Sequence, residues 1–196
     1  MNLDQLQPYL PANALKFIQE WIKPYPLTLK ITRSRETKLG DYRKINQAQR
    51  HQITVNGDLN KEAFFFVFTH EIAHMIVYAK FAYHEVMPHG KEWKIIFGKL
   101  LVDSLSVYSD DLKPHILKHA KSPKASVGAD PNIAKYLIND IQPHQIYLDE
   151  LPLGARFLLK NRIFIKMEKQ KLRYICCDEK TNKKYLVNAS TLVEKR

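Results

Sequence analysis

Two histidines and a glutamate form the pattern His-Glu-x-x-His in this sequence, at His70, Glu71 and His74. Four residues advance an α-helix by slightly more than one turn, so both imidazoles point the same way and can bind one metal ion. Glu71 falls within the same arc of the helix, close enough to take a proton from water activated by that ion. On a helix, this pattern is typical of zinc sites that hydrolyse peptides.

A catalytic zinc site needs a third protein ligand and one coordination position open to water. The candidates downstream of the motif are His84, Glu85, His89 and Glu92. His89 is favoured over Glu92, because it stands between Pro88 and Gly90, where a tight turn can bring its ring back to the helix that carries His70 and His74. The donor that stabilises the reacting oxygen stays open among Tyr42, Tyr78, Tyr83 and His84.

The elements around the motif place it inside a domain. The run Ala63–Phe68 is wholly apolar, and with Asn60 as the cap it predicts a buried helix over residues 61–82. The other elements expected here are an amphipathic helix at 12–23, strands at 27–31, after Gly40 and at 52–56, and a helix at 90–102. We therefore predict a small antiparallel sheet packed on the helix that carries the motif.

The composition of the chain changes twice after this helical region. Prolines and serines punctuate residues 104–144 and indicate a partly helical connector, in which Asp130 and Pro131 are typical of a helix start. Residues 145–196 alternate between apolar and polar types and predict a small five-stranded barrel. The expected fold class is α+β, with a catalytic domain at 1–103, the connector at 104–144 and a basic β-rich module at 145–196.

Residues 10–103 resemble the SprT-like family of zinc metallopeptidases. The resemblance rests on THEIAH at Thr69–His74, on HGKEW at His89–Trp93, which matches an HGxEF/W element of the family, and on Thr37–Gly40 and Ile53–Asn56 upstream. Many family members continue into a C-terminal zinc ribbon, whereas Cys176 and Cys177 are the only cysteines of this chain. The resemblance therefore does not extend to the last 50 residues or so.

By this resemblance the first domain has a zincin-like fold, binds one Zn²⁺ through His70, His74 and His89, and uses Glu71 as the general base. Relatives of the Spartan type cleave proteins crosslinked to DNA, so the implied substrate is a protein associated with DNA. The alternative is a nucleic-acid-binding protein in which zinc mainly stabilises the fold and no proteolysis occurs. A structural site has no use for a general base, so Glu71 discriminates between the two.

Positive charge gathers in the C-terminal module. The chain carries a formal net charge of +11, and residues 145–196 contribute twelve Lys or Arg against six Asp or Glu. Such a balance favours DNA or RNA as a partner. Alternation along the strand from Arg162 places Arg162, Phe164 and Lys166 on one face, with Lys171 and Arg173 beside them across the turn. We predict a nucleic-acid-binding face there, with a solvated lysine-rich face around a buried aromatic as the alternative.

The remaining composition is that of an ordinary globular protein, with 45% hydrophobic and 26% charged residues. No apolar run approaches the roughly 20 residues of a membrane span, and the first residues do not have the pattern of a signal peptide. Cys176 and Cys177 are adjacent and predict no disulfide framework. We expect a cytoplasmic protein, with Cys176 in a core.

Overall fold

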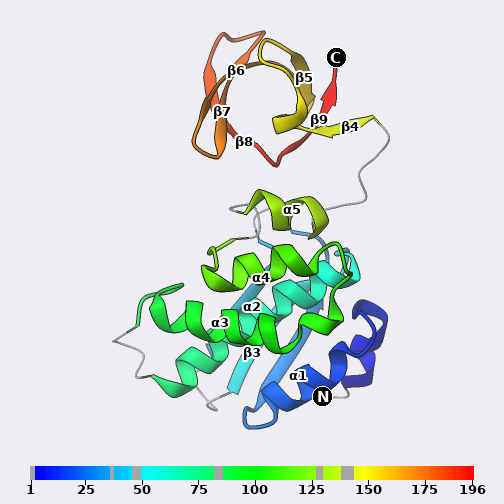
Figure 1. Cartoon of the computed structure of the whole chain (residues 1–196), viewed down its shortest axis with the longest axis vertical. Helices are drawn as coiled ribbons and strands as arrows, with labels where there is room; N and C mark the ends of the chain where they lie inside the picture. Colours follow the sequence, from blue (N-terminus) through cyan, green and yellow to red (C-terminus); the bar gives the residue numbers. More distant parts are fainter. Residues whose placement is uncertain (1–2, 36–37, 46–49, 82–85, 127–129, 138–143) are drawn as a thin grey trace. The chain divides into compact units, whose positions relative to one another are not determined.

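The computed structural model describes residues 3–35, 38–45, 50–81, 86–126, 130–137 and 144–196. The chain divides into two compact units. The first unit consists of Met1–Ala125 and Tyr136–Ile138, and the second consists of Ser126–Lys135 and Asn139–Arg196. Helices α1 to α4 and one small sheet make up most of the first unit, and a larger sheet makes up most of the second (Figure 1). The fold is therefore mixed α+β, as predicted.

The first unit is arranged around the long helix α2. Its elements are η1 Leu3–Tyr9, α1 Ala14–Ile22, β1 Leu27–Thr32, β2 Gly40–Ile45, β3 Arg50–Asn56, α2 Lys61–Lys80, α3 Lys91–Asp103, η2 Leu105–Val107 and α4 Lys113–Lys121. The Asn60 side chain caps α2 by accepting a hydrogen bond from the Ala63 amide at 2.8 Å. Helices α1 and α3 and strands β2 and β3 all contact α2, so its apolar residues are buried on nearly every side.

The small sheet differs from the predicted one in its strand order. Strand β3 lies between β1 and β2, parallel to β1 and antiparallel to β2. The prediction of a purely antiparallel sheet is therefore wrong. The chain crosses from one edge to the other before it returns to the centre, and the most buried strand, β3, takes the central place. Strand β2 is left as an edge strand that contacts α2.

The first unit also continues past residue 103, where its end was predicted. Helix α4 packs on α3 and belongs to the same unit. The two helices approach very closely at Gly98, where an added Cβ would lie 2.4 Å from the carbonyl oxygen of Ala120. The connector therefore contributes α4 to the first unit. It also contains α5, Pro131–Leu137, which begins at the predicted cap: the Asn132 amide donates to the Asp130 carboxylate at 3.2 Å.

The second unit is a single curved antiparallel sheet in the order β4-β9-β5-β6-β7-β8 (Figure 1). Its elements are β4 Gln145–Tyr147, η4 Leu148–Glu150, β5 Arg156–Leu159, β6 Arg162–Gln170, β7 Arg173–Asp178, β8 Lys184–Asn188 and β9 Leu192–Lys195. It has one strand more than predicted, β4. Phe157, Phe164 and Cys176 belong to its core, which confirms the buried position expected for Cys176.

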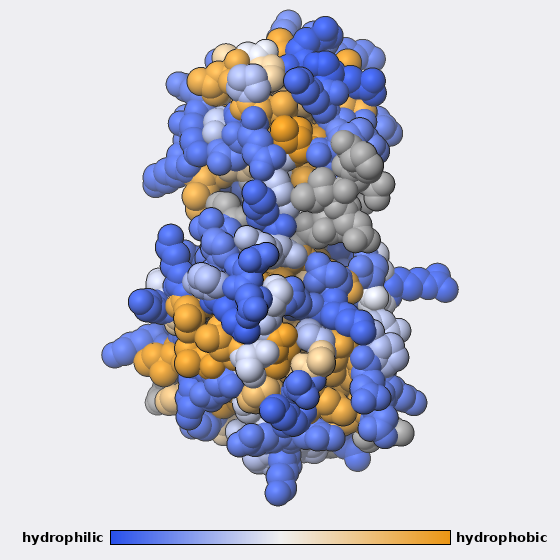
Figure 2. Space-filling model, turned by 45° about the vertical axis from the view of Figure 1, so that its right-hand side comes forward, coloured by the Kyte–Doolittle hydropathy of each residue, from blue (hydrophilic) through white to orange (hydrophobic). Residues whose placement is uncertain are grey.

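The surface in Figure 2 is mostly hydrophilic, and its hydrophobic residues gather in separate patches. Within the described part of the chain, none of the helices combines the length and the hydropathy that a membrane span requires.

We expect Gly98→Ala to destabilise the protein by about 1–3 kcal/mol, because the added methyl group collides with the backbone of α4. Helix propensity alone predicts the opposite, a gain of about 1 kcal/mol. Urea denaturation followed by circular dichroism measures the difference. Lys99→Ala, at the exposed neighbouring position of α3, is the control and should change the free energy of unfolding little.

Candidate metal centre

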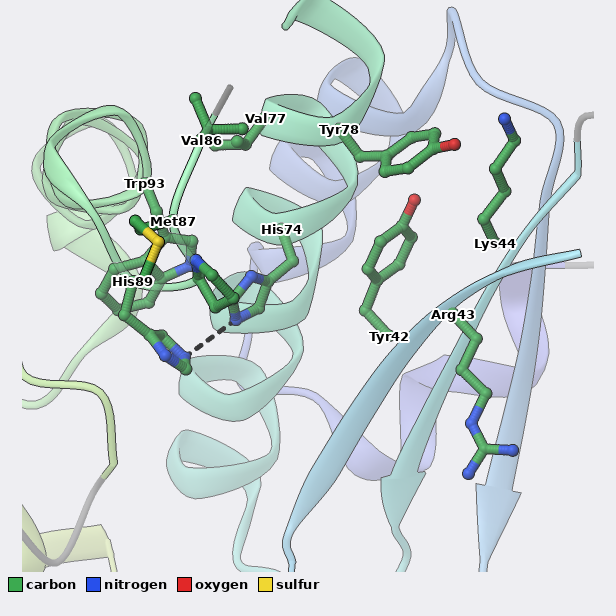
Figure 3. A pocket seen from close by; sticks show the side chains of 11 residues that line it. Tyr42, Arg43, Lys44, His74, Val77, Tyr78, Val86, Met87, His89 and Trp93 are labelled. Atoms are coloured by element: carbon green, nitrogen blue, oxygen red, sulfur yellow. Dashed lines mark hydrogen bonds between the residues drawn. The ribbon is translucent and has the colours of Figure 1, made fainter. Parts of the chain in front are cut away.

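Three histidine rings meet at one point of the first unit. His70 and His74 lie one turn apart on α2, with their Nε2 atoms 3.2 Å from each other. His89 lies just before α3, and its Nε2 is 3.2 Å from that of His70 and 3.0 Å from that of His74. The sequence predicted these three residues as ligands, and the structure brings them together. Figure 3 shows the rings of His74 and His89 from close by.

These distances fit a shared cation better than hydrogen bonds among the rings. Two nitrogens at 2.0–2.1 Å from a tetrahedral zinc ion would be about 3.3–3.4 Å apart, close to the spacing observed. Each imidazole Nε2 offers a single in-plane proton or lone pair, so three of them cannot satisfy one another in a triangle. The cluster could therefore hold one metal ion.

The backbone before α3 explains how His89 reaches α2. His89 adopts the left-handed conformation with φ of 58°, and the Gly90 amide closes a tight turn on the Met87 carbonyl at 2.8 Å. An added Cβ at Gly90 would lie 2.8 Å from the same carbonyl oxygen. The turn thus requires glycine beside His89, and it directs His89 back to His70 and His74 as the sequence predicted.

Trp93 supports all three rings, a role that sequence analysis missed. It is buried, and its ring centroid lies 4.7 Å from that of His70, 5.4 Å from that of His74 and 4.7 Å from that of His89. Phe97 contacts His70 as well, at 5.3 Å between centroids. The apolar stripe predicted for the helix that is now α3 identified both residues as part of the core. The available signal that Trp93 also supports the histidine rings was its position four residues after His89.

The environment keeps the rings neutral, which is the form that binds metals. Burial, followed by the neighbouring His74 and His89, lowers the pKa of His70 to about 2. Burial and then His89 lower the pKa of His74 to about 4. Burial also lowers the pKa of His89.

Glu71 lies against strand β2 and is buried. Its Oε1 is 2.7 Å from the position that a Cβ would take at Gly40, and its carboxylate accepts a hydrogen bond from the Tyr42 amide. Burial first, and the charge of Asp41 second, raise the pKa of Glu71 to about 8. A cation held by the histidines would act in the other direction and favour the carboxylate.

A cavity of about 800 Å³ opens beside His74 and His89 (Figure 3). The residues around it come from β2, α2, the segment before α3 and α3 itself: Tyr42, Arg43, Lys44, Val77, Tyr78, Val86, Met87, Pro88 and Trp93. The Tyr42 hydroxyl is 2.9 Å from the Nδ1 of His51, on the neighbouring strand. Tyr42 and Tyr78, two of the four candidates for the donor to the reacting oxygen, both line this cavity. Tyr83, His84 and Glu85 lie outside the described residues, and Glu92 does not join the histidine cluster.

The predicted nucleic-acid-binding face is wrong in two of its five residues. Phe164 and Lys166 point inward and are buried, at 5% and 2% exposure. Lys166 Nζ donates to the backbone carbonyls of Leu148 at 2.7 Å, Asp149 at 3.3 Å and Leu151, and lies 3.8 Å from the centre of the Tyr174 ring. The lysine can face inward because these carbonyls satisfy its ammonium group.

The other three residues of that face are exposed: Arg162, Lys171 and Arg173. Arg162 is engaged with neighbouring groups, since its Nε donates to Asp178 at 2.7 Å and its guanidinium lies over the rings of Phe164 and Tyr185. These five residues therefore do not form the predicted arrangement, in which an exposed aromatic ring lies between positively charged side chains. Phe164 belongs to the core of its own unit.

Comparisons with known proteins identify no family: the chain matches no protein-family model, no curated protein and no solved structure. Its function therefore has to be inferred from the side chains themselves. The site offers three convergent imidazole nitrogens, a buried carboxylate next to one of them along α2, and an adjoining cavity.

We expect the purified protein to bind one divalent transition-metal ion per chain. The variants His70→Ala, His74→Ala and His89→Ala should each lose most of the bound metal. Two imidazoles alone leave the ion with half of a tetrahedral shell. Mass spectrometry of metals after dialysis against zinc gives the content. His144→Ala, at an exposed histidine outside the cluster, is the matched control. Full metal retention in His89→Ala would contradict the third ligand.

We expect Lys166→Met to lower the free energy of unfolding by about 1–3 kcal/mol, because it leaves buried carbonyl oxygens without their donor. Chemical denaturation monitored by tyrosine fluorescence measures the loss. Lys171→Met makes the same change at an exposed position and should alter stability little. Equal stability of the two variants would argue against a structural role for Lys166.

Proposed function

We propose that the chain is a zinc-dependent peptidase of the SprT-like type, with a zincin-like catalytic unit. The observation that carries the proposal is the convergence of the Nε2 atoms of His70, His74 and His89 within 3.0–3.2 Å, with Glu71 next to the first of them along α2. Three histidines leave one tetrahedral position for water, as catalytic zinc sites require. The cavity lined by His74 and His89 adjoins the cluster and supports the proposal as a place for a substrate.

In this proposal the three imidazoles hold the ion and Glu71 moves the proton. Zinc bound there supplies Lewis acidity, which polarises a peptide carbonyl and lowers the pKa of water. Glu71 accepts a proton from the attacking water and passes it to the nitrogen of the departing amine, so that the carboxylate is restored at the end of the cycle. The Tyr42 amide and the close approach of Gly40 hold that carboxylate in one place.

Proteins are the proposed substrate, and proteins bound to DNA the proposed class. The net charge of +11 supports a polyanion near the site of action. The free thiols of Cys176 and Cys177 support a reducing compartment, and we extend the proposal to the cytoplasm. The same net charge favours the second candidate, a nucleic-acid-binding protein whose metal only stabilises the fold.

We expect Glu71→Gln to lose peptide cleavage by about 10²–10⁴-fold while its metal content stays that of the wild type. The assay measures cleavage of unfolded casein and of a protein crosslinked to DNA, and the same preparations are analysed for zinc. Glu92→Gln is the matched control, since this glutamate lies outside the histidine cluster, and it should keep both activity and metal.

Two results would contradict the proposal. A wild-type protein that binds zinc but cleaves neither substrate supports the structural metal site. Equal cleavage by wild type and Glu71→Gln would assign the proton transfer to another group.

A further inference from the structure

A groove on the first unit runs between α3 and α4 and shares no residue with the metal centre. Its volume is about 430 Å³. The residues that line it are Lys94, Ile95, Gly98, Lys99, Val102, Asp103, Leu117, Ala120, Lys121 and Pro123. Figure 2 shows hydrophobic residues collected in patches between hydrophilic ones on the same unit.

The walls of the groove carry large apolar side chains that the fold itself does not use. Ile95, Val102 and Leu117 are exposed by 61%, 49% and 40%. Ile95 and Val102 are seven residues apart on α3, which places them on one side of the helix about 10 Å from each other along its axis. The floor is narrow and backbone-rich, since Gly98 and Ala120 touch there. Such a strip matches two turns of a helix that presents apolar residues at i, i+3 and i+7.

The rim of the groove is positively charged. Lys94, Lys99 and Lys121 are all exposed, and Asp103 is the single acidic residue among those that line it. A ligand that covers the apolar strip would therefore be favoured by negative charge at its margins.

We propose that this groove binds an acidic amphipathic helix of a partner protein. Nucleic acid fits it less well, because the lining residues include no aromatic ring on which a base could stack. A second copy of the chain is disfavoured by repulsion between molecules of net charge +11. The proposal concerns a surface apart from the metal centre and does not rest on the proposed function.

The test uses the full chain and a synthetic helical peptide of about 15 residues, with leucines at i, i+3 and i+7 and glutamates at the flanking positions. Fluorescence anisotropy should show binding that is at least about tenfold tighter than that of a peptide in which lysines replace the glutamates. The triple variant Lys94→Glu, Lys99→Glu, Lys121→Glu should weaken acidic-peptide binding by about tenfold or more. The double variant Ile95→Gln, Val102→Gln should weaken it similarly.

Matched controls separate the groove from the total charge. Lys16→Glu, Lys23→Glu and Lys61→Glu together make the same change of charge at exposed positions outside the groove, and Leu153→Gln removes an exposed apolar side chain in the second unit. Both should bind the acidic peptide within about threefold of wild type. Thermal melts establish that every variant is folded.

Three outcomes would overturn the proposal. The first is no binding of the acidic peptide by the wild type. The second is an equal loss in the groove variants and the controls. The third is a groove triple variant that loses affinity for a DNA duplex while its affinity for the peptide is unchanged, which would assign the lysines to nucleic acid.

Discussion

The close approach of three imidazole nitrogens is the constraint on which the first unit depends. Partly buried neutral rings with their Nε2 atoms 3.0–3.2 Å apart gain little from one another, so packing must hold them in place. Trp93 does this by touching all three, and Trp93 itself is fixed against Phe97. Because such a cluster must be held by the residues packed around it, the apolar side chains of α2 and α3 help to keep the three rings together.

The small sheet has a comparable role toward Glu71. Strand β2 lies at the edge and comes so close to α2 that only glycine fits at position 40, and the next residues supply the amide of Tyr42 and the charge of Asp41 to the carboxyl group. Burial and Asp41 oppose its ionisation, whereas the amide, Lys38 and Arg35 favour it. A metal ion on the three histidines would also favour the ionised form of Glu71. The histidine cluster and Glu71 therefore depend on different neighbours, α3 for the histidines and β2 for the glutamate.

Local patterns predicted the elements better than their arrangement. Asn60 as a cap, the apolar run that follows it and the spacing of His70 and His74 are encoded within a few residues, and all are found as predicted. The order of the strands in the small sheet depends on which strand is buried most, which alternation does not reveal. The turn at His89 was predictable because Gly90 follows it, whereas its support by Trp93 depends on tertiary contacts.

Strand β6 shows most clearly what alternation leaves undetermined. A period of two divides its side chains into two sets, and the set with Arg162, Phe164 and Lys166 was predicted to form an exposed binding face. The structure turns Phe164 and Lys166 inward instead. Phe164 stacks on Phe157, and Lys166 reaches carbonyls of the Leu148–Glu150 turn and of Leu151, so the inward set is stabilised by partners from distant segments. Because the ammonium group of Lys166 finds carbonyl acceptors inside the unit, the hydropathy pattern alone predicted the wrong face. A positive charge in a sequence therefore indicates a binding surface only after its hydrogen-bond partners are known.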